Sequence, residues 1–129
     1  MARLRQGAIA QDGQAARELR IFIREHFTEQ VELAVVGEKT EIAIARATDA
    51  IYQAVLGHTT RELYSQPGTT PGKRDTLPAA AQNAIAMGEC RAAEALEAEV
   101  FSGGTTQRID KVTKICRENG GRVRRWLPW

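Results

Sequence analysis

The sequence contains little of what marks a secreted, membrane or metal-binding protein. Its two cysteines, Cys90 and Cys116, have no cysteine or histidine at metal-ligand spacing, and two are too few for a disulfide framework. Free cysteine is among the most buried residue types, so we expect both thiols to be reduced and packed inside helices. No run of about 18 uncharged apolar residues occurs, and no apolar core of signal-peptide length follows the first residues. We therefore expect a cytoplasmic protein without a membrane segment.

Aromatic residues are also scarce, at 5% of the 129 residues, whereas 43% of the residues are hydrophobic. A β-sandwich core depends on β-branched and aromatic side chains, and here alanine fills many of the apolar positions instead. Small side chains suit the close packing of helices. The length supports one domain with a core of its own, so we predict an all-α, compact, bundle-like single domain.

Residues with catalytic chemistry are few and isolated. His26 and His58 have no neighbour in sequence that would complete a nucleophile pair or a metal site. Residues 103–106 lack the lysine of a phosphate-binding loop, and no strand pattern precedes them. Four carboxylates in the segment 79–101 are better explained as a solvated helix face than as paired catalytic acids. These are Glu89, Glu94, Glu97 and Glu99. We predict no enzymatic activity, no cofactor and no metal site.

The spacing of apolar residues predicts helices joined by short connections. Apolar positions three and four apart recur along most of the chain, which is the period of an amphipathic helix. The predicted helices span residues 14–27, 40–56, 60–65, 76–101 and 106–119. After the first of them, Thr28 is a candidate cap. Residues 31–36 then fit either a short second helix, which the acids Glu29 and Glu32 favour, or a strand, because valine and leucine alternate there.

The helix expected over 40–56 has the clearest signals at its end. Its broad apolar arc predicts a central helix that touches partners on two sides. Gly57 is suited to a left-handed cap, and Thr59 with Glu62 has the spacing of a capping box for the next helix. These residues predict a sharp corner between two helices.

Two prolines and two glycines in residues 66–73 predict a loop. In the long helix that follows, Ile85, Gly88, Ala92 and Leu96 are candidates for the inner face. Gly88 would allow another helix to approach closely, at a cost of about 1 kcal/mol relative to alanine.

The two ends of the chain differ from the middle. Residues 1–12 are polar and small, so we expect a flexible start, and residues 13–121 make up the predicted helical domain. Gly120 and Gly121 are predicted to end the last helix. Residues 122–129 then remain as a basic tail that contains tryptophan.

Basic residues accumulate near the C-terminus, where only Asp110 and Glu118 oppose them between residues 108 and 125. They are Arg108, Lys111, Lys114, Arg117, Arg122, Arg124 and Arg125. Such a surface neutralises phosphates and releases counterions, so we predict these residues as nucleic-acid contacts. Trp126 and Trp129 are predicted either to stack on bases or to anchor a protein partner. A merely solvated helix face is the remaining interpretation.

Four short motifs carry a resemblance to a known group of proteins. They are ATDAIY at 47–52, LGHTTREL at 56–63, RDTL at 74–77, and Glu89 followed by AAEAL at 92–96. In this order they resemble a helical region of phage and mobile-element proteins, of the kind that accompanies KilA-N-type domains and occurs in DNA-damage-inducible protein D. The resemblance covers about residues 40–100. It implies association with DNA transactions without catalysis, and it assigns a catalytic or ligand role to no residue.

The sequence therefore predicts a non-enzymatic accessory or regulatory protein in DNA transactions of a phage or mobile element. It would bind nucleic acid or the DNA-processing machinery, and we expect a homo-oligomer. The alternative is a protein-interaction module or inhibitor that uses Trp126 and Trp129 as anchors.

Overall fold

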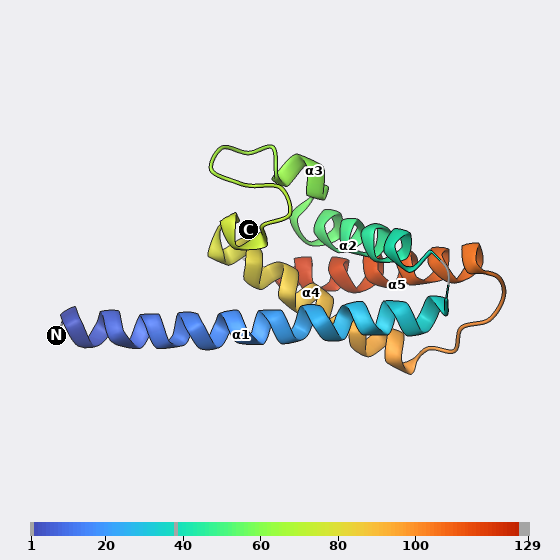
Figure 1. Cartoon of the computed structure of the whole chain (residues 1–129), viewed down its shortest axis with the longest axis horizontal. Coiled ribbons are helices and arrows are strands. Elements are labelled where there is room, and N and C mark those ends of the chain that lie inside the picture. The colour runs from blue at the N-terminus through green and yellow to red at the C-terminus, as the bar shows by residue number, and fades with distance from the viewer. Residues whose placement is uncertain (1, 38, 127–129) are drawn as a thin grey trace.

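Helices make up most of the chain in the computed structural model, which describes residues 2–37 and 39–126, with side chains for 13–37 and 39–125. The elements are α1 (Ala2–Val35), α2 (Thr40–Leu56), α3 (Thr60–Leu63), the 3-10 helix η1 (Arg74–Thr76), α4 (Ala79–Ala98) and α5 (Thr105–Trp126). The described residues form no strand beyond a single bridge in the loop after α3. The predicted all-α bundle-like fold is thus confirmed (Figure 1). Within this part of the chain, no helix combines the length and the apolar character needed to cross a membrane.

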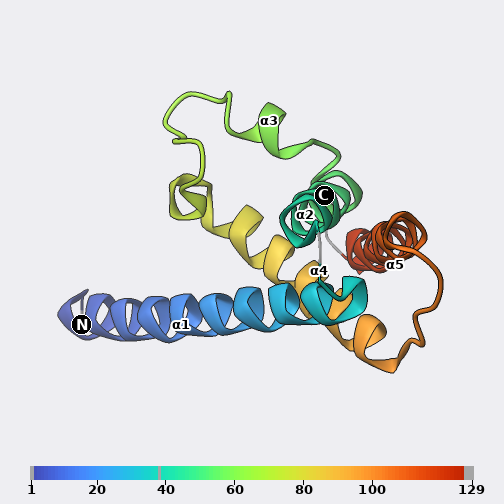
Figure 2. The ribbon, with the colours of Figure 1, turned by 45° about the vertical axis from the view of Figure 1, so that its right-hand side comes forward.

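The first helix is one continuous element where the sequence predicted two. α1 runs through Thr28 to Val35, so the predicted break at Thr28 and the strand alternative for residues 31–36 are both wrong. The reason is a buried stripe that crosses the expected break: Phe27, Val31 and Val35 recur every four residues and are almost fully buried. The helix also begins at Ala2 rather than near residue 12. Its N-terminal part extends beyond the other helices (Figures 1 and 2).

The second helix lies at the centre of the bundle. α2 packs against α1, α4 and α5, which confirms the prediction of partners on more than one side (Figure 2). Gly57 adopts the left-handed φ of 77° that ends α2. The capping box is also present, because the Thr59 side chain accepts from the Glu62 N–H and the Glu62 carboxylate accepts from the Thr59 N–H.

Two glycines allow α4 and α5 to approach α2 from different sides. A Cβ atom at Gly88 of α4 would lie 2.9 Å from Val55 Cγ2, so the predicted close approach is confirmed. A Cβ at Gly120 of α5 would lie 2.8 Å from Ala54 Cβ. The prediction that Gly120 and Gly121 end the last helix is therefore wrong: α5 continues to Trp126, and Gly120 is a packing residue within it.

The segment from α3 to α4 forms an arm at one end of the bundle (Figure 2). After α3 the chain turns through residues 66–73, as predicted, and then enters η1. α4 begins at Ala79 with Pro78 as its N-cap residue, and ends at Ala98 rather than at residue 101. The arm brings Arg74 back to the bundle, where it contacts α4.

Candidate functional site: two basic surfaces

Four of the seven predicted phosphate contacts share the outer face of α5. Lys114, Arg117, Arg122 and Arg125 are exposed, and none of them forms a hydrogen bond or ion pair with another described residue. Because α5 continues past Gly121, residues 114 and 125 are eleven positions apart and point in nearly the same direction. Glu118 lies four residues from both Lys114 and Arg122, and Asp110 lies four residues before Lys114, so this side of the helix also carries two exposed carboxylates. We call these four cations the α5 basic face.

The other three predicted contacts are engaged within the fold. Arg108 Nη1 donates to the Ala34 carbonyl at 3.1 Å, and Arg124 Nη1 donates to the Val55 carbonyl at 3.0 Å. These carbonyls lie in the last turns of α1 and α2, neither of which has a basic residue there. The two arginines thus supply the cation and the donor that a helix C-terminus favours.

Lys111 is held at the connection between α4 and α5. Its Nζ lies 2.8 Å from the Glu99 carboxylate and donates to the Val100 carbonyl at 3.0 Å. It also lies over the Phe101 ring, 5.4 Å from the centroid. This lysine fastens the connection to the start of α5.

The two predicted anchors Trp126 and Trp129 lie at the edge of the described part of the chain. The backbone of Trp126 is the last residue of α5, whereas its side chain and all of Trp129 lie outside the described residues. Their proposed role as a base-stacking or partner-binding pair stays a prediction.

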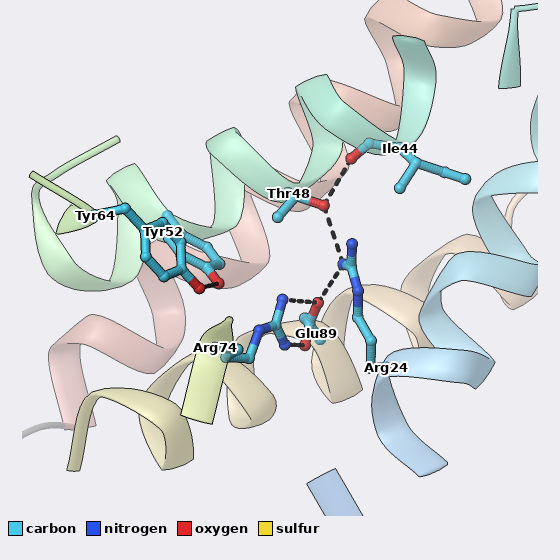
Figure 3. A network of polar contacts seen from close by, with 7 residues as sticks. All are labelled: Arg24, Ile44, Thr48, Tyr52, Tyr64, Arg74 and Glu89. Atoms are coloured by element: carbon cyan, nitrogen blue, oxygen red, sulfur yellow. Dashed lines mark hydrogen bonds and ion pairs between the residues drawn. The ribbon is translucent and has the colours of Figure 1, made fainter. Parts of the chain in front are cut away.

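The structure contains a second polar site that the sequence did not predict. Glu89 was expected on a solvated helix face, but it is buried. Its side chain is 0% exposed and its carboxylate accepts two hydrogen bonds from Arg74, at 2.6 and 3.2 Å, and one from Arg24 at 2.6 Å (Figure 3). A carboxylate in the interior is stable only when paired and hydrogen-bonded, and the bidentate guanidinium provides the strongest such geometry. α1, η1 and α4 are joined at this point.

The neighbouring residues of α2 extend this network (Figure 3). Thr48 accepts from Arg24 Nη1 at 3.0 Å and donates to the Ile44 carbonyl at 2.7 Å. The Tyr52 ring lies under the Arg74 guanidinium, and its hydroxyl is 3.4 Å from that of Tyr64. Burial raises the pKa of the Tyr52 hydroxyl well above its ordinary value, although Arg74 opposes the shift, so the hydroxyl is neutral and available as a donor.

A sequence signal for Glu89 does exist. It stands on the apolar arc of α4, four residues after Ile85 and three before Ala92, both of which are buried. A charged residue on an inner arc requires a partner, and this requirement points to a buried ion pair. Its partners Arg24 and Arg74 lie 65 and 15 residues away, and no local pattern connects them.

The cysteines differ from each other more than predicted. Both are free thiols. Cys116 is fully buried, as predicted, and burial raises the pKa of its thiol to about 12. Cys90 is only half-buried, so the prediction that it is buried is wrong.

The histidines lie beside single carboxylates. His26 Nε2 is 4.0 Å from Glu97, and His58 Nδ1 is 3.6 Å from Glu62 in the capping box. Among the described residues, no group of three or more histidine, cysteine, aspartate or glutamate side chains is arranged to hold a metal ion.

Comparison of the chain with protein-family models, with curated proteins and with solved structures found no match. Two basic surfaces are the candidate binding sites: the α5 basic face, and the groove above Glu89 that Arg24 and Arg74 line.

Proposed function

We propose that the protein is a non-enzymatic accessory factor that binds nucleic acid through the α5 basic face. The main support is the set of four exposed cations without an intramolecular partner among the described residues: Lys114, Arg117, Arg122 and Arg125. Cations that stabilise the fold have partners here, as Arg108 and Arg124 do. These four have none, and their repulsion opposes folding slightly unless an anion is bound.

The shape of the face suits a phosphate backbone. Eleven residues of α-helix span about 16 Å, a length in which one DNA strand presents about five phosphates. Contacts of this kind carry no base information, so we expect binding that depends weakly on sequence and strongly on salt. A role in DNA transactions of a phage or mobile element rests on the resemblance of residues 40–100. The free thiols support a reducing compartment, and a cytoplasmic location is part of the proposal.

A salt titration with duplex DNA tests the proposal. Fluorescence anisotropy between about 50 and 300 mM salt should give a slope of log K against log salt of about −3.6 for four phosphate contacts. In the variant Arg117→Gln with Arg122→Gln, we expect the slope to fall by about 1.8, because each lost contact contributes about 0.9. A suitable control is Arg61→Gln with Lys73→Gln, which removes the same charge from the far side of α2 and α4.

Two outcomes of the salt titration would contradict binding through the α5 basic face. Absence of binding at the lowest salt would refute the proposal, as would an equal loss of slope in the control variant. Far-UV circular dichroism of each variant checks that the helices are retained, which we expect since the four substituted side chains are exposed and form no hydrogen bond or ion pair with another described residue.

Self-association is a second candidate function, favoured by an apolar hollow between α1 and α4. The hollow has a volume of about 330 Å³ and is lined by Leu19, Ile23 and Met87 among others. Leu19 and Met87 are 59% and 43% exposed, and Phe22, three residues after Leu19 on α1, is 65% exposed. The variant Leu19→Glu should lower the solution mass measured by light scattering if two copies meet there. An unchanged mass that equals one chain would exclude the homo-oligomer.

A further inference from the structure

A large groove lies on the other side of the bundle from α5. Its volume is about 1000 Å³, and its walls come from α1, α2, α3, the loop after α3, η1 and the first turn of α4. Six of its lining residues are basic: Arg17, Arg20, Arg24, Arg61, Lys73 and Arg74. They arise from three separate parts of the chain, so this concentration of charge results from the fold and not from a local run of basic residues.

The charges in the groove are not balanced. Asp75 lines the groove and Glu89 lies behind it, so the six cations exceed the carboxylates by four. Arg17, Arg61 and Lys73 form no hydrogen bond or ion pair with any other described residue. A concave surface of one charge focuses the field, and it raises the local concentration of ions of opposite sign.

The floor of the groove is held in place by the network around Glu89 (Figure 3). Arg74 is fixed by two hydrogen bonds to the buried carboxylate, and Arg24 is fixed between Glu89 and Thr48. Arg24 uses only Nη1 in these contacts, so its Nε and Nη2 groups retain N–H donors without a partner among the described residues. Such donors need little reorganisation to bind an anion.

We propose that this groove binds a small ligand with at least two phosphate groups, of the size of a nucleotide. Arginine forks match phosphate oxygens in a bidentate way, and the cations face the cavity from two walls, with Arg17, Arg20 and Arg24 on α1 and the others on the arm. The volume is that of a small-molecule site. This site is separate from the α5 basic face, and it adds a ligand to the function proposed above.

Isothermal titration calorimetry of the full chain at low salt tests the inference with pyrophosphate, ADP and adenosine. Pyrophosphate and ADP should bind, and adenosine should not. The variant Arg61→Gln with Lys73→Gln should weaken both phosphorylated ligands roughly tenfold or more, because each residue contributes a charge-assisted contact. The variant Arg117→Gln with Arg122→Gln, which loses the same charge from α5, should leave both affinities unchanged.

Three results would overturn the inference: no binding of pyrophosphate or ADP, equal binding of adenosine, or binding that is insensitive to Arg61→Gln with Lys73→Gln. The two charge-removal pairs are independent, so failure of the groove leaves the test of the α5 basic face intact.

Discussion

Gly120 and Gly121 are adjacent residues of one helix, yet alanine should have opposite effects at the two positions. Gly120 is buried against α2, where a Cβ would lie 2.8 Å from Ala54 Cβ and 3.5 Å from the Ile51 carbonyl oxygen. At Gly121 nothing lies within 4 Å of the added atom. The pair therefore separates the effect of helix propensity from that of packing.

The magnitudes follow from these distances. Alanine in a helix interior is favoured over glycine by about 0.8–1 kcal/mol, and Gly121→Ala should gain most of this. Gly120→Ala gains the same term, but its methyl group meets a methyl that has no other rotamer, so helix α2 or α5 must shift. Overpacking of this kind costs about 1–3 kcal/mol, which makes Gly120→Ala destabilising by about 1 kcal/mol and the two variants different by about 1–3 kcal/mol.

Urea unfolding followed by far-UV circular dichroism measures both changes as shifts of the midpoint at constant slope. The double variant Ala54→Gly with Gly120→Ala removes the clash and should show favourable coupling between the two sites. Equal stabilisation by Gly120→Ala and Gly121→Ala would refute close packing of α5 on α2. Destabilisation by both would indicate a left-handed helix end at these glycines, as the sequence alone suggested.

Three further predictions concern the buried cluster, the corner after α2 and the thiols. Glu89→Gln should lower the free energy of unfolding by about 2–3 kcal/mol, because two arginines lose their counter-charge, and an unchanged urea midpoint would show that the carboxylate is dispensable. Hydrogen bonds from the N–H and the hydroxyl of Thr59 lower the pKa of the Glu62 carboxyl. The stability that this carboxylate adds to the fold is therefore complete above the ordinary carboxyl pKa and is lost as the pH falls through the lowered pKa. Glu62→Gln should reduce the change in urea midpoint between about pH 6 and about pH 3, and a pH profile identical to that of the unchanged protein would contradict this. A maleimide should label Cys90 in the folded protein and Cys116 only in urea, since Cys116 is buried and its thiol pKa is raised to about 12; rapid labelling of both thiols in buffer would argue against the packing of α5.

The sequence predicted the helices well where the signals at their ends agreed with the packing. The bounds of α2, the left-handed Gly57 and the capping box of Thr59 were all confirmed. The predictions were wrong where a local end signal competed with the burial of apolar side chains on both sides of it. Thr28 has the chemistry of a cap, yet Phe27 and Val31 on either side of it are buried on one stripe, so the helix gains more by continuing.

The candidate sites were predictable only in part, because charge is visible in a sequence and pairing is not. The basic residues of α5 were found from composition, whereas the groove brings together basic residues of α1 and of the arm that are 37 or more residues apart in the chain. Glu89 was assigned to the solvent because other glutamates of α4, such as Glu94 and Glu97, are indeed exposed. What distinguishes Glu89 is its position on the buried arc of α4, which a count of charged residues does not reveal.

Some arginines of α5 bind other helices and others are exposed on its outer face, and this difference determines which mutations can test function. Arg108 and Arg124 complete the C-termini of α1 and α2, and a cation at such a position contributes about 0.3–1 kcal/mol. A variant that removes Arg122, Arg124 and Arg125 together would therefore loosen the contact between α5 and α2 as well as the outer face. Loss of DNA binding in that variant would not separate the two causes. Substitutions confined to Arg117, Arg122 and Arg125 change the surface charge alone, so they are the ones whose effect on binding measures the contact itself.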